Sequence, residues 1–169
     1  MLFRSNTDPL NHARALLGSP RPSDAVLFIC HLLPRREAVW WAAQCVRALL
    51  GEAATDETLG AAEIWVRTPE DDNRQAALSA ANASDRRKST TWLAFAAGWS
   101  GGSLLPADQK PVPPPAGACA MAANAAIMMA VAAGDPRAVV DRIEACAEAG
   151  VRFASDGEPT VFVRKAAPR

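Results

Sequence analysis

The hydrophobic and polar positions of the chain follow the pattern of helices rather than that of strands. Alanine is the most frequent residue, and Val, Ile and Thr are too scattered to give the alternation typical of a β-strand. Proline and glycine divide the sequence into segments that each have the length of one helix. The pattern therefore predicts an all-α protein, a compact bundle of about seven or eight helices.

Six short helices are predicted in residues 1–97. Asp8 and Pro9 begin the first helix and Gly18 ends it, while Pro34 begins the third and Gly51 ends it. Ser23, Thr55 and Thr68 are the expected side-chain caps of the second, fourth and fifth helices. The expected ranges of helices two to six are 24–33, 34–50, 55–67, 69–83 and 89–97.

A connection rich in glycine and proline, residues 98–115, is predicted to separate these six helices from two more. Consecutive prolines fix an extended backbone there. The last two helices are expected at 116–133 and 135–150, the second ending at Gly150. Residues 151–169 are predicted to be an irregular tail, although 160–163 have the composition of a short strand. All 169 residues are expected to form one helical domain.

The helix expected at 116–133 contains no charged residue, but its composition argues against a membrane span. Alanine contributes little to membrane insertion, and leucine is missing from this segment. Ala118, Ala122, Ala126 and Ala130 form a ridge of small residues that permits close helix packing. We therefore expect a buried central helix and no membrane span.

Charge and cysteine usage exclude several classes of function. The 18 basic and 18 acidic residues balance, whereas a dedicated nucleic-acid binder needs an excess of Lys and Arg. Cys30, Cys45, Cys119 and Cys146 lie in apolar segments without metal-ligand spacing, so they predict buried free thiols, no metal site and no cofactor. Free thiols of this kind indicate a cytoplasmic protein.

The most distinctive segment is residues 34–47. On a helical wheel Arg36, Trp40 and Arg47 share one stripe, so that an indole is flanked by guanidinium groups. Trp and Arg dominate binding hot spots, which makes this stripe a candidate protein contact. In the alternative interpretation, Trp40 and Trp41 both fill the core and Arg35 or Arg36 pairs with a carboxylate of another helix.

The turn that contains Trp99, Gly101, Gly102 and Ser103 does not have the spacing of a phosphate-binding loop. It is typical of a helix stop before an extended segment. Nucleophilic catalysis also finds no support, because Cys30 and His31 are sequence neighbours that face different directions on a helix. We predict no catalytic residue.

Several separated motifs resemble an uncharacterised bacterial family, a domain of unknown function. They are residues 34–41, Trp65-Val66 with Pro69 and Arg74, residues 94–104, and Pro113-Pro114-Pro115, and together they span most of residues 20–150. Members of that family sometimes occur beside type VI secretion genes. The resemblance implies an accessory or adaptor role in a bacterial secretion assembly and supplies no catalytic residue.

The sequence favours a non-enzymatic module that binds another protein. The expected contacts are Arg35, Arg36, Glu37, Trp40, Arg47, Trp99, Gly101, Gly102 and Ser103. The proline segment 111–115 is a further candidate contact, and its other interpretation is that it only spaces the helices. The alternative is an enzyme or small-ligand-binding protein whose pocket lies between helices and uses Arg35, Arg36 and Glu37. We expect no nucleic-acid partner, and self-association stays open.

Overall fold

Each segment predicted to be helical contains a helix. The computed structural model describes residues 8–51, 55–106 and 108–162. Within these residues the protein has eight α-helices, one short 3-10 helix and no strand. The elements are α1 (Pro9–Leu17), α2 (Ser23–Leu32), α3 (Arg35–Leu50), α4 (Glu57–Arg67), α5 (Asp71–Ala83), α6 (Ser89–Gly98), α7 (Ala118–Ala132), η2 (Pro136–Ala138) and α8 (Val139–Ala154).

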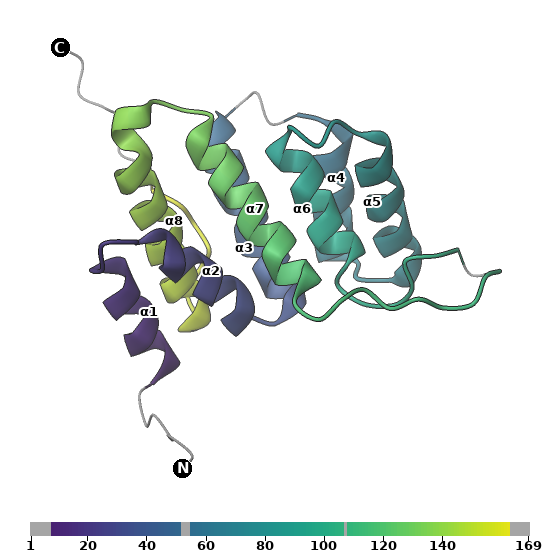
Figure 1. Ribbon diagram of the computed structural model, residues 1–169, viewed down its shortest axis with the longest axis horizontal. Coiled ribbons are helices and arrows are strands. Elements are labelled where there is room, and N and C mark those ends of the chain that lie inside the picture. Colours follow the sequence, from purple (N-terminus) through teal and green to yellow (C-terminus); the bar gives the residue numbers. More distant parts are fainter. Residues whose placement is uncertain (1–7, 52–54, 107, 163–169) are drawn as a thin grey trace.

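Helix α7 is the hub of the bundle, as its small-residue ridge predicts. It packs against α2, α3, α6 and α8, with α4, α5 and α6 on one side and α1, α2 and α8 on the other (Figure 1). Ala122, Ala126 and Ala130 of the ridge are buried. The C-terminal helix α8 contacts the N-terminal helices α1 and α2, so the two ends of the fold close on each other.

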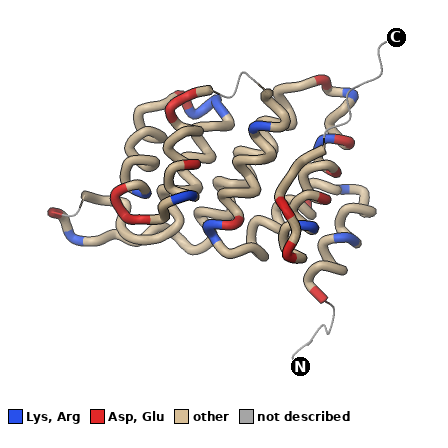
Figure 2. The backbone as a smooth tube through the Cα atoms, turned by 180° about the vertical axis from the view of Figure 1, so that it is seen from behind, with Lys and Arg blue, Asp and Glu red and all other residues tan. Residues whose placement is uncertain are grey.

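The helices α6 and α7 carry no charged residue, and they form the most extensive helix pair. Charged positions gather at helix ends, at connections and on the outer helices (Figure 2). The glycine- and proline-rich connection separates α6 from α7 along the chain but not in space. Among the described residues, no helix has both the length and the apolar character needed to cross a membrane.

Several helix starts differ from the sequence prediction. Asp56, not Thr55, caps α4, and its carboxylate accepts from the Leu59 N–H at 3.1 Å. Helix α5 begins after Glu70 rather than after the predicted cap Thr68. A carboxylate is as good a cap as a hydroxyl, so propensity alone does not separate such close neighbours.

Three further boundaries also shift. Ser23 is the first residue of α2 rather than its cap. Helix α7 begins at Ala118 instead of residue 116, because Gly117 takes a left-handed conformation with φ of 77°. Residues 151–154, predicted to be irregular, continue α8 to Ala154. Residues 160–162 form no strand, and residue 163 lies outside the described residues.

Gly150 does not end a helix but lets α8 approach the core. A Cβ at this position would lie 2.7 Å from Trp41 Cζ2 and 2.9 Å from Ile29 Cγ2. Trp41 is fully buried and its Nε1–H donates to the Cys146 carbonyl at 3.0 Å. The prediction that Trp40 and Trp41 both fill the core is thus wrong for Trp40, which is 38% exposed.

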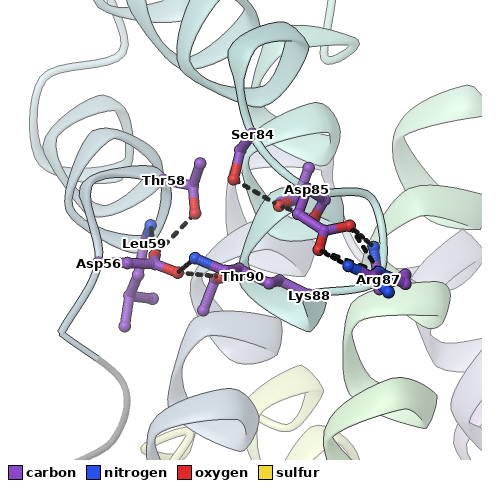
Figure 3. A network of polar contacts seen from close by, with 9 residues as sticks. Asp56, Thr58, Leu59, Ser84, Asp85, Arg87, Lys88 and Thr90 are labelled. Atoms are coloured by element: carbon purple, nitrogen blue, oxygen red, sulfur yellow. Dashed lines mark hydrogen bonds and ion pairs between the residues drawn. The ribbon is translucent and has the colours of Figure 1, made fainter.

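A polar network ties the start of α4 to the start of α6 (Figure 3). The Asp56 carboxylate accepts from the Thr58 hydroxyl at 2.7 Å and from the Thr90 hydroxyl at 2.6 Å, and Lys88 Nζ lies 3.8 Å away. Partial burial pushes the pKa of Asp56 upward. The two hydroxyls, the Leu59 N–H and Lys88 outweigh it, so the pKa lies below its ordinary value.

Gly150→Ala and Gly60→Ala are expected to have opposite effects on stability. Both glycines are helical, but a Cβ at Gly60 meets nothing within 4 Å. Gly60→Ala should stabilise the protein by about 0.5–1 kcal/mol, because alanine loses less backbone entropy on folding. Gly150→Ala should destabilise it by about 1–3 kcal/mol through overpacking. Urea unfolding gives the free energy of unfolding of both variants. A stabilising effect of Gly150→Ala would contradict close packing of Gly150 against Trp41 and Ile29.

Asp56→Ala should lower the free energy of unfolding by about 1–2 kcal/mol at neutral pH, because it removes the α4 cap. The folded-state pKa of Asp56 is depressed, so its contribution is present above the unfolded value near 3.8 and disappears as the pH falls through the lower folded value. Denaturant unfolding should therefore show the variant to be less stable than the wild type at pH 7, and this difference in free energy of unfolding should shrink at acidic pH. Asp85→Ala, in an exposed ion pair with Arg87, is the control and should change stability little.

Candidate functional site

Arg35 and Arg36 are neighbours in the first turn of α3, yet their side chains reach different parts of the molecule. Arg35 Nη1 donates to the carbonyl oxygen of Ser100 at 2.6 Å, just beyond the end of α6. Arg36 Nε donates to the carbonyl oxygen of Val66 at 2.7 Å, in the last turn of α4. Successive helical residues point about 100° apart, which separates the two guanidinium groups. Backbone carbonyls, rather than the predicted carboxylate of another helix, accept these hydrogen bonds.

Side chains of α5 donate hydrogen bonds to the end of α6 and to the turn that follows it. Arg74 Nη1 donates to the Gly98 carbonyl at 2.9 Å, and its Nε contacts Asp71 Oδ1 at 2.7 Å. Gln75 Nε2 donates to the carbonyl of Ser103 at 3.1 Å. Helix C-termini leave carbonyl groups without hydrogen-bond partners, and the side chains of Arg74 and Gln75 supply donors to carbonyl groups at and after this helix end.

Arg74 belongs to the motifs that carry the family resemblance, but its buried position was not predicted from the sequence. Its side chain is nine-tenths or more buried, and its Nη2 has no hydrogen-bond partner among the described residues. It stands on the same helical stripe as the buried residues Ala77, Leu78 and Ala81. A cation on the apolar face of an alanine-rich helix is the sequence signal that could have identified it.

The connection after this turn folds back on itself instead of running on as an extended spacer. The Ser103 hydroxyl accepts from the N–H groups of Leu105 at 3.0 Å and Val112 at 3.1 Å. The N–H of Leu104 donates to the carbonyl of Val112 at 2.7 Å. Ser103 therefore closes the neck of a loop and returns the proline segment to the start of α7.

A hollow, here called the loop cavity, lies between this loop and the ends of α2, α3 and α7. Its volume is about 390 Å³. Its lining residues come from four segments: Cys30, His31, Leu33 and Arg35; Trp99, Gly101 and Gly102; Pro113, Pro114 and Pro115; and Gly117, Ala118, Cys119 and Ala120. No aspartate or glutamate is among them.

The two thiols of the loop cavity are not activated nucleophiles. Burial raises the pKa of Cys119 to about 12, although the nearby Arg35 charge acts in the opposite direction. Burial, and secondarily the neighbouring Cys119, raises the pKa of Cys30 well above its ordinary value. Because the thiolate is the reactive form, both groups are inert at neutral pH. All four cysteines are free and buried, as predicted.

A second hollow, the tryptophan groove, lies between α3 and α4. Its volume is about 460 Å³, and it is lined by Arg36, Trp40, Ala43, Gln44, Arg47, Glu63, Val66 and Arg67. Arg47 and Glu63 form a bidentate ion pair in which Nη2 and Oε2 are 2.7 Å apart. Together with the Arg36 contact to Val66, this ion pair joins the two helices across the groove.

Trp40 is the aromatic residue that lines the groove, and the ring of Phe153 packs against it. Its ring meets that of Phe153 edge to face, with centroids 5.1 Å apart. Trp99 is likewise held at the loop cavity, where it stacks on Phe95 with ring centroids 4.7 Å apart. Each hollow therefore presents one indole supported by a second aromatic ring.

The structure divides the residues predicted as contacts between these hollows. Arg35, Trp99, Gly101 and Gly102 line the loop cavity, whereas Arg36, Trp40 and Arg47 line the tryptophan groove, as their shared stripe predicts. Glu37 and Ser103 line neither. The alternative prediction of one pocket built from Arg35, Arg36 and Glu37 is therefore not what the geometry provides.

A known protein family matches most of the helical part of the chain. Residues 12–154 match a family of unknown function, DUF6931. The chain belongs to this family. No curated protein and no solved structure matches the chain. The expected membership of an uncharacterised domain family is thus confirmed, and the DUF6931 match covers α2 to α8 with both hollows.

No group of three or more His, Cys, Asp or Glu side chains that could hold a metal ion occurs in the described part of this DUF6931 protein. The side chains that line the two hollows include guanidinium donors and aromatic rings. Such groups recognise anions and flat apolar surfaces.

Gly102→Ala should destabilise the protein by about 1–3 kcal/mol, whereas Gly101→Ala should be nearly neutral. Gly102 has φ of 62°, and a Cβ there would lie 2.6 Å from Arg74 Nη2. At Gly101 the nearest atom is Arg35 Nη1 at 3.8 Å, an ordinary contact. Thermal or urea unfolding of the two variants tests the fit of the loop over Arg74. Equal stabilities would show that this fit is not as described.

Proposed function

We propose that this protein is a non-enzymatic protein-binding module whose contact surface is the tryptophan groove. The proposed occupant is an acidic segment of a partner protein that inserts one apolar side chain beside Trp40. The exposed indole between guanidinium groups carries this proposal. The setting that the family resemblance implies, an adaptor in a bacterial type VI secretion assembly, belongs to the same proposal.

The exposure of Trp40 contrasts with the burial of its neighbour. Trp41 is 0% exposed and Trp40 is 38% exposed, so the fold fills its core with one indole and leaves the other at the surface. Aromatic residues that are rigid before binding lose little entropy when a partner covers them. Phe153 and the side chains of the groove give Trp40 that rigidity.

The charges around the groove favour an acidic partner. Arg36, Arg47 and Arg67 line the groove against one carboxylate, Glu63, which Arg47 already engages. Arg36 uses Nε on Val66, and Arg67 is exposed at the end of α4. Carboxylates of a partner could pair with these guanidinium groups and speed association.

Peptide display against the immobilised protein tests the proposal, with the Trp40→Ala variant screened in parallel. Selected peptides should combine Asp or Glu with an aromatic or aliphatic residue. Their binding free energy should weaken by about 2 kcal/mol or more in Trp40→Ala, as at other interface hot spots. Affinity should also fall with added salt. Fluorescence anisotropy with synthetic peptides measures both effects.

Reversing the charge of an exposed arginine of the groove tests the acidic preference without changing a side chain that packs in the core. Arg67→Glu should weaken the same peptides while lowering the melting temperature only slightly, because Arg67 is exposed and only its favourable position at the C-terminal end of the α4 dipole is lost. Arg21→Glu, an exposed arginine that lines neither hollow, is the matched control. Peptides without acidic bias, or peptides that bind Trp40→Ala and Arg67→Glu as well as the wild type, would refute the proposed function.

A further inference from the structure

We propose that the loop cavity is a binding site for a small organic anion with a carboxylate or phosphate head and a flat apolar body. The site shares none of its lining residues with the tryptophan groove, so it stands or falls independently of the proposed function. Its volume of about 390 Å³ is within the range of small-molecule sites.

The wall of the loop cavity carries basic side chains. Arg35 and His31 line it, and none of the described residues that line it is an aspartate or glutamate. Arg35 is also the first residue of α3, where the positive end of the helix dipole disfavours a cation. An anion bound beside Arg35 would relieve this unfavourable placement.

Backbone N–H donors at the start of α7 belong to the same wall. Within α7 the first regular helical hydrogen bond is from the Met121 N–H to the Gly117 carbonyl, and the Ala118 N–H is satisfied by Pro115. The N–H groups of Cys119 and Ala120 have no acceptor among the described residues, although these residues are only 4% and 8% exposed. The first N–H groups of a helix have no acceptor within that helix, so these two amides at the cavity are available to a ligand oxygen.

A buried arginine packs against Gly102, one of the lining residues. Arg74 Nη2 has no hydrogen-bond partner among the described residues, and a Cβ at Gly102 would lie 2.6 Å from it. Asp71 engages only the Nε edge of this guanidinium. Arg74 packs against Gly102 and is not itself a lining residue, so Arg35 is the lining guanidinium that a bound anion would contact.

The apolar part of the wall defines the body of the ligand. Trp99, Pro113, Pro114 and Pro115 line the cavity and contribute largely apolar ring surfaces. The thiols of Cys30 and Cys119 are protonated and complete a neutral floor. The arrangement binds a ligand reversibly, with the anionic head at Arg35 and α7 and the ring against Trp99.

Calorimetry and amide NMR of the full chain at low salt test this site with phenyl phosphate, benzoate and inorganic phosphate. We expect one saturable site and shifts of the amides of Gly101, Gly102, Cys119 and Ala120. Binding of benzoate but not phenyl phosphate assigns a carboxylate head, and the converse assigns a phosphate head. Phenyl phosphate should bind more tightly than inorganic phosphate because its ring contacts Trp99.

Two variants remove the site in different ways. Arg35→Gln removes the guanidinium, and Gly101→Asp places a carboxylate beside it, at a position where a Cβ has room. Each should weaken binding by roughly tenfold or more, the loss expected for one charge-assisted contact. Gly101→Asp keeps the test valid if Arg35→Gln unfolds. Arg21→Gln is the control.

Two results would overturn the proposal. One is the absence of saturable shifts at the cavity amides with all three probes. The other is binding that Arg35→Gln and Gly101→Asp leave unchanged in folded protein, as judged by circular dichroism.

Discussion

The structure depends on arginines that donate to the carbonyl groups at the ends of other helices. Arg36 serves the end of α4, Arg74 serves the end of α6, and Arg142 Nη1 donates to Val131 at the end of α7 at 3.1 Å. Helices α6 and α7 have no basic residue in their last turns, so the cations come from elsewhere in the chain. A charge-assisted hydrogen bond to such a carbonyl contributes about 1.5–3 kcal/mol and complements the helix dipole.

This use of arginine also explains why the hollows lie where they do. Arg35 and Arg36 extend from the first turn of α3 to two different helix ends. Arg35 lines the loop cavity beside the loop that follows α6. Arg36 lines the tryptophan groove together with Trp40. The same contacts therefore build the fold and equip its surface with guanidinium groups.

The local punctuation of the sequence was enough to predict the helices and part of the site. Proline, glycine and capping residues act within a few positions, so the order and approximate ends of the helices followed from them. The stripe of Arg36, Trp40 and Arg47 also followed, because helical periodicity alone places these residues on one face.

What sequence reasoning missed depends on contacts between distant segments. Gly150 reads as a helix stop until Trp41 is known to lie against it. Arg74 reads as a surface cation until Gly98 and Gly102 are known to cover it. The exposure of Trp40 and the burial of Trp41 are set by which neighbours α3 meets, and helical periodicity shows only that their directions differ.

The small side chains of the central helices finally constrain where a ligand or partner can bind. Alanine occupies many of the buried positions of α6 and α7, alongside larger residues such as Leu93, Phe95 and Ile127, and lets these two helices approach closely. The loop cavity lies at helix ends and the tryptophan groove lies between two helices, where longer side chains line the space. In these two hollows the lining includes arginine and tryptophan, which recognise charge and flat apolar surface.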